Sequence, residues 1–316
     1  MRNNTVVVIF GPTASGKSKL AIDVCKQLNG EVVSADSMQI YRKMDIGTAK
    51  ALPEEQQGIP HHLIDIIEPN ENYSLENFLK DCESTVDDVL SRGKLPVIAG
   101  GTGLYISSFI NGVKLAEAKI DEDYRNAMEY IAETEGNLSI KQLLYGIDKQ
   151  AYLKLKTNDR KRIIRALEVY RATGKTISQN NEDSQGNSKY NFIIFGLNCE
   201  NRNVLYERIN LRVDEMMKNG LEQEARMLYN SDLSDTARQA IGYKELFGYF
   251  NGDKSLEQAV EEIKQYSRNY AKRQITWFKK ELNVTWIPID EKNYEEILKN
   301  TVNGIVKNAN VCYNKE

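Results

Sequence analysis

Gly11-Pro12-Thr13-Ala14-Ser15-Gly16-Lys17-Ser18 is the segment from which the architecture of this chain can be worked out. It matches the phosphate-loop pattern G-x-x-x-x-G-K-[ST], which requires a strand before it and a helix after it. The β-branched and aromatic run Thr5–Phe10 predicts the strand. Apolar residues at helical spacing predict a helix from the loop to about Leu28, ended by Gly30. Because both flanks are correct, a chance match at a structural turn is the weaker interpretation.

The loop has a defined chemistry. Its glycines let backbone N–H groups converge on an anion, and the positive end of the following helix dipole adds to the attraction. We expect Lys17 to neutralise terminal phosphate charge and Ser18 to hold Mg²⁺. The motif therefore predicts a phosphate or diphosphate ligand, without specifying ATP.

The segments that follow the loop predict an α/β fold with a P-loop NTPase-like parallel sheet flanked by helices. The expected further strands are Glu31–Ala35, His62–Ile67, Leu95–Ala99, Phe192–Cys199 and Val284–Ile289. The expected further helical stretches are Gly103–Ile110, Val204–Tyr229, Leu256–Leu282 and a C-terminal segment.

The pattern changes between residues 115 and 189. Apolar residues there recur at helical spacing, and only Asn180–Ser188 suggests a polar loop. We therefore predict a core domain from residues 1–114 and 190–316, and a mostly helical insertion domain from residues 115–189.

Composition narrows the class of protein. Hydrophobic residues make up 41% and charged residues 28% of the 316 residues, which is typical of globular proteins. No segment approaches the roughly 18 apolar residues that span a bilayer, and the run Val6–Phe10 is too short for a signal peptide. We expect a cytoplasmic protein. The four isolated cysteines favour reduced thiols over a zinc site.

The residues that follow two of the predicted strands differ in their chemistry. Asp36 ends the second strand, where a carboxylate can act as a general base or magnesium ligand, or can simply cap the next turn. The strand Leu95–Ala99 runs into Gly100-Gly101-Thr102-Gly103. A typical ATPase carries an aspartate there, so ATP hydrolysis is less natural; a plain glycine turn is the alternative interpretation.

Basic residues gather in two segments, although the net charge is −3. Residues Lys154–Lys175 and Ile263–Lys280 each carry an excess of six positive charges. Such clusters favour a polyanion partner, but solvated helix faces remain the alternative. Arg208 and Arg212 lie four residues apart and either reach into a cleft to bind phosphate or stay on the surface.

Taken together, these blocks resemble the tRNA dimethylallyltransferase family, also called tRNA isopentenyltransferases, over nearly the whole chain. The resemblance is carried by Gly11–Ser18, Asp36-Ser37-Met38-Gln39-Ile40-Tyr41, Met44-Asp45-Ile46-Gly47-Thr48-Ala49-Lys50, Gly100-Gly101-Thr102-Gly103-Leu104-Tyr105, Arg165-Ala166-Leu167-Glu168-Val169, Ile241-Gly242-Tyr243-Lys244 and Lys272-Arg273-Gln274-Ile275-Thr276-Trp277. The zinc finger that some eukaryotic relatives add is missing, so the chain resembles the bacterial form.

The resemblance implies transfer of a dimethylallyl group from dimethylallyl diphosphate to N6 of an adenosine in tRNA. The adenosine would be the one 3′-adjacent to the anticodon in tRNAs that read codons starting with U. The P-loop would hold the diphosphate with Mg²⁺, and Asp36 would take the proton from the amine. Thr102 would lie near the reacting groups, and Lys17 and Arg212 would contact the diphosphate.

The resemblance also implies contacts with the tRNA anticodon stem-loop. Those contacts would involve Asp36, Ser37, Met38, Gln39, Thr102, Arg125, Lys161, Arg162, Ile163, Ile164, Arg165, Gln239, Ala240, Ile241, Gly242, Tyr243, Lys244, Lys272, Arg273, Gln274, Ile275, Thr276, Trp277, Phe278 and Lys279. Lys244 departs from the arginine that is common at its position. We expect a monomer that binds tRNA and dimethylallyl diphosphate and does not associate with membranes.

Two other functions remain open from the residues themselves. A small-molecule P-loop kinase would use Asp36 to activate an acceptor hydroxyl. A nucleotide-gated RNA-binding module would use the same loop without catalysis.

Overall fold

The computed structural model describes residues 4–113, 115, 121–183, 188–280, 283–290 and 293–309. The chain divides into two compact units. Residues 1–107 and 189–316 form the first, here called the sheet unit, and residues 108–188 form the second, the helical unit.

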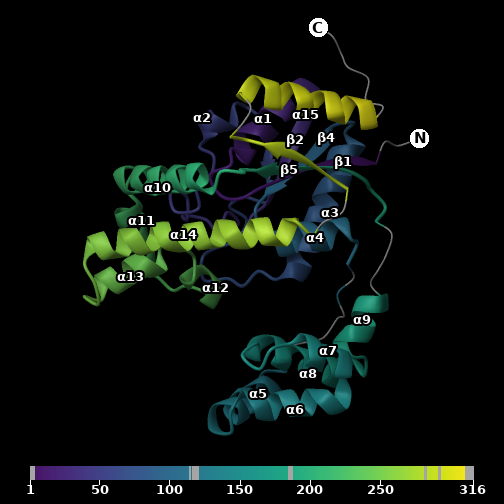
Figure 1. The fold of residues 1–316 in the computed structure, drawn as a ribbon, viewed down its shortest axis with the longest axis vertical. Helices are drawn as coiled ribbons and strands as arrows, with labels where there is room; N and C mark the ends of the chain where they lie inside the picture. Colours follow the sequence, from purple (N-terminus) through teal and green to yellow (C-terminus); the bar gives the residue numbers. More distant parts are fainter. Residues whose placement is uncertain are drawn as a thin grey trace. The chain divides into compact units, whose positions relative to one another are not determined.

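The sheet unit is built on six parallel strands (Figure 1), which confirms the predicted α/β fold. Their order across the sheet is β3-β2-β4-β1-β5-β6. The bounds are β1 Thr5–Phe10, β2 Gly30–Ala35, β3 His61–His62, β4 Leu95–Gly100, β5 Asn191–Asn198 and β6 Val284–Pro288. Every residue of β1, β2 and β4 is buried, as expected for central strands covered on both faces.

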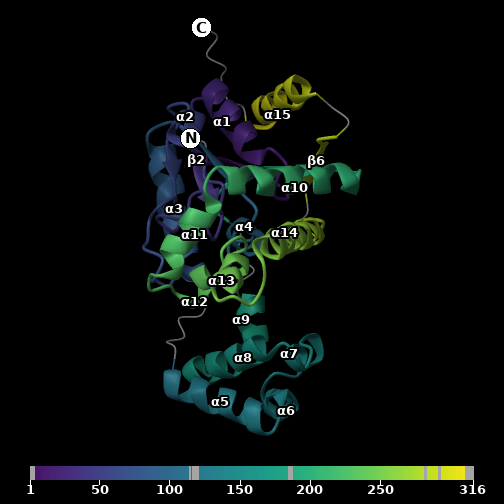
Figure 2. The ribbon, with the colours of Figure 1, turned by 90° about the vertical axis from the view of Figure 1, so that its left-hand side faces the viewer.

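Helices cover the sheet and extend beyond it. In both Figure 1 and Figure 2, α1 and α15 lie side by side on one face of the sheet, where their apolar residues join those of β1 and β4 in one core. The bounds are α1 Lys17–Leu28, α2 Pro53–Gln56, α3 Leu75–Ser91, α4 Gly103–Ile110, α10 Arg202–Lys218, α11 Leu221–Tyr229, α12 Asp235–Arg238, α13 Lys244–Phe250, α14 Leu256–Phe278 and α15 Tyr294–Ala309.

Strand register brings three sequence motifs to one edge of the sheet. Phe10 of β1 is level with Gly100 of β4, and Gly100 is level with Ala35 of β2. The P-loop, Asp36 and the glycine turn therefore begin side by side at the carboxyl edge. A Cβ at Gly100 would lie 2.2 Å from the carbonyl oxygen of Ala35, so only glycine permits this approach.

Several predicted boundaries are wrong, including that of the helix predicted at Leu256–Leu282, which ends at Phe278. The strand expected at His62–Ile67 is only His61–His62, because Leu63 and Asp65 adopt φ values of 60° and 55° that break an extended chain. The single helical stretch predicted at Val204–Tyr229 is divided into α10 and α11 at Gly220, which has φ 101°. Helix α1 ends on Asn29 in the left-handed conformation, and Gly30 begins β2.

Helix α3 is not among the elements expected from the sequence. Ser74 caps it, its hydroxyl accepting the N–H of Asn77. The helix buries Phe78, Cys82, Val86 and Val89, which recur at intervals of three or four residues. The helical period is present in the sequence, but mixed charged residues obscure it.

The helical unit contains the helices α5 to α9. They span Glu122–Thr134, Asn137–Ile147, Lys149–Lys154, Arg160–Thr173 and Ile177–Asp183. Met128 of α5, Ile140 of α6 and Ile163 of α8 are among the residues of its own apolar core. The polar loop predicted from Asn180 is wrong up to Asp183, which still belongs to α9, and residues 184–187 lie outside the described residues.

The described ranges contain neither a membrane-spanning helix nor an obvious metal cluster. None of their helices is long and apolar enough to cross a bilayer. The same residues contain no group of three or more side chains suited to a metal ion. Cys25, Cys82 and Cys199 are free and buried, whereas Cys312 lies outside the described residues.

Candidate active site

A cavity of about 490 Å³ opens in the sheet unit where the carboxyl ends of β1, β2 and β4 meet α10 and α14. The P-loop supplies Thr13, Lys17 and Ser18, and the segment after β2 supplies Asp36–Gln39. The remaining lining residues are Gly47, Thr48, Ala49, Ala99, Gly100, Ile209, Arg212, Val213, Met216, Gln239, Ala240, Ile241, Gly242, Lys244, Ile263, Tyr266, Ser267, Tyr270, Arg273 and Gln274. Polar and apolar groups thus share one space.

The P-loop backbone is curved as an anion-binding turn. Gly16 has φ 84° and Ala14 has φ 62°, so two nearby residues adopt the left-handed conformation. Such alternation directs successive N–H groups toward one point. The first N–H groups of α1 have no partner inside the helix and lie at its positive end. The loop is therefore preorganised for a phosphate group.

Two cations approach this loop. Arg212 Nη1 donates to Thr13 Oγ1 over 3.0 Å, and Lys17 lies at the start of α1. Burial, followed by repulsion from Arg212, lowers the pKa of Lys17 to about 8, although Asp36 acts in the opposite direction. Burial also lowers the pKa of Arg212. In the described part of the chain, neither cation forms an ion pair with a carboxylate. An anionic ligand would therefore offset the repulsion between Lys17 and Arg212.

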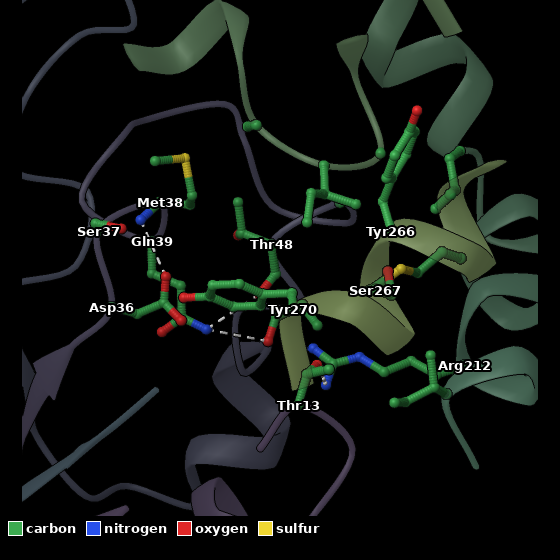
Figure 3. A pocket seen from close by; sticks show the side chains of 18 of the residues that line it. Thr13, Asp36, Ser37, Met38, Gln39, Thr48, Arg212, Tyr266, Ser267 and Tyr270 are labelled. Atoms are coloured by element: carbon green, nitrogen blue, oxygen red, sulfur yellow. Dashed lines mark hydrogen bonds between the residues drawn. The ribbon is translucent and has the colours of Figure 1, made fainter. Parts of the chain in front are cut away.

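Asp36 stands at the end of β2 with one oxygen engaged. Its Oδ1 accepts the backbone N–H of Met38 over 3.0 Å, which confirms the capping interpretation for that oxygen. Figure 3 shows the carboxylate directed into the cavity near the Tyr270 ring. Burial and the Asp36 charge raise the pKa of Tyr270 to about 12. Because one oxygen caps the turn, the other is left to act as a general base in the cavity.

The glycine turn after β4 is fixed by two polar residues. Thr102 Oγ1 accepts the N–H of Ser37 over 3.0 Å. Gln274 Oε1 accepts the N–H of Thr13, and its Nε2 donates to the carbonyl of Gly101, each over 2.9 Å. Gln274 on α14 thus connects the P-loop to the turn. Gln274 is only 5% exposed and lines the cavity, so its side chain positions these two segments, and its contact with RNA stays a prediction.

Many of the predicted site residues meet in this cavity. Of the residues predicted to bind the diphosphate or to contact tRNA, those lining it are Thr13, Lys17, Ser18, Asp36, Ser37, Met38, Gln39, Arg212, Gln239, Ala240, Ile241, Gly242, Lys244, Arg273 and Gln274. Lys272, Thr276, Trp277 and Lys279 are exposed on or just after α14. Arg125 and the segment Lys161–Arg165 belong to the helical unit, where Arg125 pairs with Glu168.

Some predicted RNA contacts are wrong for the side chain. Ile163 and Ile164 belong to the core of the helical unit, and Tyr243 is fully buried. Phe278 stacks on Phe10 with ring centroids 3.9 Å apart, which anchors α14 on β1. A side chain that fills a core cannot also face RNA, because the helical period places only part of each segment outward.

The basic clusters are also less free than their charge count suggests. Lys264 pairs with Asp214 of α10 over 2.8 Å and is 14% exposed, so α14 uses it to pack against α10. In the other cluster, Arg160 pairs with Glu133 over 3.1 Å. Arg208 is exposed and does not line the cavity, whereas Arg212 does. Only part of each cluster remains available to a polyanion.

Several lining residues have no role in the sequence-based prediction. Tyr266 and Tyr270 lie one turn apart on α14 and face the cavity (Figure 3). Their spacing of four residues is visible in the sequence, but aromatic residues at that spacing more often fill a core. Met216 follows Arg212 by one turn of α10, and the same periodicity could have identified it.

Known proteins share both the sequence and the fold. A family model described as IPP transferase matches residues 39–281, and another, described as isopentenyl transferase, matches residues 4–66. A tRNA dimethylallyltransferase of Thermoanaerobacter sp. is 49% identical over 312 residues, covering 96% of this chain and 98% of the relative. The Caldanaerobacter subterraneus relative of the same name is 51% identical over 93% of this chain and 95% of its own length.

Solved structures give the same result. A tRNA isopentenylpyrophosphate transferase of Bacillus halodurans aligns with a TM-score of 0.74 and 42% identity, covering 97% of both chains. A eukaryotic dimethylallyltransferase, captured acting on tRNA, aligns with a TM-score of 0.84 and 28% identity over 99% of this chain and 81% of that one. With a family model over most of its length and relatives near 50% identity, the chain belongs to the tRNA dimethylallyltransferase, or IPP transferase, family.

Proposed function

We propose that this protein transfers a dimethylallyl group from dimethylallyl diphosphate to N6 of the adenosine 3′-adjacent to the anticodon, in tRNAs that read codons starting with U. One observation carries the proposal. Two cations without a carboxylate partner in the described residues, Lys17 and Arg212, share a cavity with Asp36. The cavity thus combines groups that can bind a diphosphate with a carboxylate that can act as a base. A dimethylallyltransferase, the name that the relatives carry, needs both.

The donor side of the reaction needs an anion site that strengthens as charge develops. When the allylic C–O bond breaks, its electron pair leaves with the diphosphate. We expect the P-loop N–H groups, Lys17 and Arg212 to stabilise that charge. Because burial and Arg212 lower the affinity of Lys17 for a proton, a bound anion should restore that affinity.

The acceptor side needs a base. The exocyclic amine of adenine is a weak nucleophile, and it becomes acidic only as the new C–N bond forms. Asp36 would accept the N6 proton at that stage, using the oxygen that does not cap Met38. The adenine must leave its stack to enter the cavity, which is easier in an anticodon loop than in a duplex.

Magnesium fits the donor site. The Ser18 hydroxyl lines the cavity beside Lys17, and a hydroxyl with diphosphate oxygens forms the all-oxygen ligand set that Mg²⁺ prefers. When bound, the ion would neutralise part of the diphosphate charge.

Three further expectations belong to this proposal. The tRNA would be bound through exposed basic residues that include Lys161 and Arg162 of the helical unit and Lys272 of α14. The substrate would place the enzyme in the cytoplasm. We also expect a monomer, which sedimentation would check.

Two labelled donors test the proposal. Radiolabelled dimethylallyl diphosphate and ATP would each be offered with and without tRNA. Label should enter tRNA only from the dimethylallyl donor and should be recovered as prenylated adenosine after digestion. Phosphoryl transfer from ATP to a small acceptor without tRNA, and no prenyl transfer, would establish the kinase instead. Binding of tRNA with no transfer from either donor would indicate an RNA-binding module.

A further inference from the structure

Glu224 of α11 is a buried carboxylate whose described hydrogen-bond partners are main-chain donors and one tyrosine. It is 6% exposed. Its oxygens accept the N–H groups of Asp45, Ile46 and Gly47 over 2.9 to 3.0 Å, and the Tyr243 hydroxyl over 2.6 Å. Three successive N–H groups around one anion form a small nest, so Glu224 fixes the conformation of the segment Asp45–Gly47.

Tyr243 holds the same segment from the other side. It is completely buried, and a Cβ on Gly47 would lie 2.5 Å from its ring. Burial, followed by the Glu224 charge, raises the pKa of Tyr243, so its hydroxyl stays protonated and donates. Glycine at position 47 is therefore required by contact with this ring rather than by backbone strain.

These residues stand behind two walls of the cavity. Gly47, Thr48 and Ala49 form one wall, and Gln239–Gly242 with Lys244 form a second wall that adjoins it, since a Cβ on Gly242 would lie 3.9 Å from Gly47 Cα. Glu224 joins the first wall to Tyr243, which follows directly on the second. Neither Glu224 nor Tyr243 is among the described residues that line the cavity.

The first wall is also connected to the Asp36 segment. Gln39 Nε2 donates to the carbonyls of Thr48 and Ala49 over 3.2 and 3.4 Å. In Figure 3, Thr48 lies beside Gln39, which follows Asp36 by three residues, whereas Arg212 bonds Thr13 of the P-loop. Glu224 thus acts on the part of the cavity that holds the base, while the phosphate-binding part rests on other contacts.

We infer that Glu224 and Tyr243 are positioning residues that set the acceptor side of the cavity, fixing how these two adjoining walls meet so that a flipped adenine reaches Asp36. The inference rests on the proposed function, because it needs a nucleobase as acceptor. Neither residue touches the reacting atoms. Both act through Gly47–Ala49 and Gln239–Gly242.

Two substitutions remove the link with little change in volume. Tyr243→Phe keeps the ring against Gly47 but deletes the hydrogen bond to Glu224. Glu224→Gln places an amide donor against a nest of N–H donors, which leaves groups unpaired. We expect kcat/KM for tRNA to fall about tenfold in Tyr243→Phe and more in Glu224→Gln. The Kd for dimethylallyl diphosphate should stay within about twofold, because the P-loop contacts do not change.

Matched controls lie nearby. Tyr229→Phe deletes a hydroxyl that bonds Asn251 in the same helical cluster, and Glu222→Gln deletes a surface carboxylate on the same helix as Glu224. Both controls should keep the wild-type kcat/KM. Thermal melting of all four variants separates a loss of stability from a loss of positioning, since assays would be run well below each Tm.

The outcomes are distinct. If wild type transfers the prenyl group and a folded Tyr243→Phe variant keeps the wild-type KM and kcat for tRNA, the inference is overturned while the proposed function stands. Equal losses for donor binding and tRNA use would also overturn it. Should Glu224→Gln fail to fold, Tyr243→Phe alone decides. A wild-type protein without prenyl transfer would instead remove the proposed function.

Discussion

Arg125 of the helical unit and Arg212 of the sheet unit are both partly buried, but only Arg125 forms a described ion pair with a carboxylate. In the helical unit, Arg125 makes two hydrogen bonds of 2.7 and 2.9 Å to Glu168, which is 2% exposed. In the sheet unit, Arg212 donates to a hydroxyl and repels Lys17, and Asp36 attracts both cations without forming a described ion pair with either. A cation matched by a carboxylate holds a fold together, whereas a cation left facing another cation is prepared for a ligand.

Glu168 of the helical unit and Asp36 of the sheet unit differ in the same way. Glu168 is committed to Arg125 and lies 3.7 Å from Arg165, so its charge is already used. Asp36 has only a backbone N–H as a described hydrogen-bond partner. A count of charged residues does not distinguish side chains that form an ion pair from side chains that remain available to a ligand. Substitutions in each of these two groups should therefore have different effects.

The largest effect is expected at Asp36. Asp36→Asn keeps the shape of the side chain but removes the proposed base, so the single-turnover rate of prenyl transfer should fall by roughly 10²–10⁴-fold. Donor and tRNA affinity should change little, because the P-loop and the basic surfaces remain. Rapid-quench measurements with saturating enzyme would provide the rate. A near-normal rate would show that Asp36 only caps its turn.

Removing one of the two available cations should produce the next largest effect. Arg212→Met should weaken dimethylallyl diphosphate binding roughly 10- to 100-fold at pH 7, because it removes a charged hydrogen-bond donor to phosphate. Arg208→Met on the same helix is the control, because Arg208 does not line the cavity. Equal weakening in the two variants would mean that Arg212 has no special relation to the donor.

The pH dependence of donor binding sharpens this test. The pKa of Lys17 is about 8 in the structure, and a bound anion favours the protonated amine and raises that pKa. Binding therefore takes up a proton above pH 8, so affinity should be full below that pH and decline as pH rises through it. In Arg212→Met the repulsion is gone, the pKa of Lys17 rises, and the decline should begin at higher pH. Titration calorimetry across this range would detect an unchanged onset, which would contradict the argument.

The paired charges should affect stability instead. Glu168→Gln leaves Arg125 without its partner, and we expect the unfolding free energy of the helical unit to drop by about 2 kcal/mol. The expected cost is moderate because the Arg125 side chain is 34% exposed. Arg171→Gln breaks a more exposed pair with Asp121 and should cost less than about 1 kcal/mol. Urea denaturation would compare them, and a larger cost for Arg171→Gln would reverse the assignment.

The smallest effect concerns residues that form no described ion pair. Lys161 and Arg162 are exposed at the start of α8. Replacing both with alanine should weaken tRNA binding and reduce the log–log salt slope by about 0.7 for each phosphate group that the variant no longer neutralises. Donor affinity should not change. If the slope is the same as in wild type, these residues form a solvated face and the RNA surface lies elsewhere.

Much of the architecture could be predicted because it depends on near neighbours. The strands Thr5–Phe10 and Leu95–Ala99 and the helix Gly103–Ile110 were predicted to within one residue, since continuous apolar runs and glycine turns are local signals. The strand at His62–Ile67 was wrong because an apolar run cannot reveal that Leu63 and Asp65 adopt positive φ. Within the predicted RNA-contact segment Lys161–Arg165, helical periodicity alone does not show which side chains are buried, such as Ile163, and which are exposed, such as Lys161.

Residues close together in the chain were enough to predict the parallel sheet, the P-loop, the position of Asp36 at a strand end and the family resemblance. Which charges are available depends instead on segments far apart in the chain. Arg212 meets Thr13 across 199 positions and Glu224 meets Asp45 across 179. Such contacts depend on how helices pack on the sheet, and packing follows from the shape of the whole core rather than from any short segment.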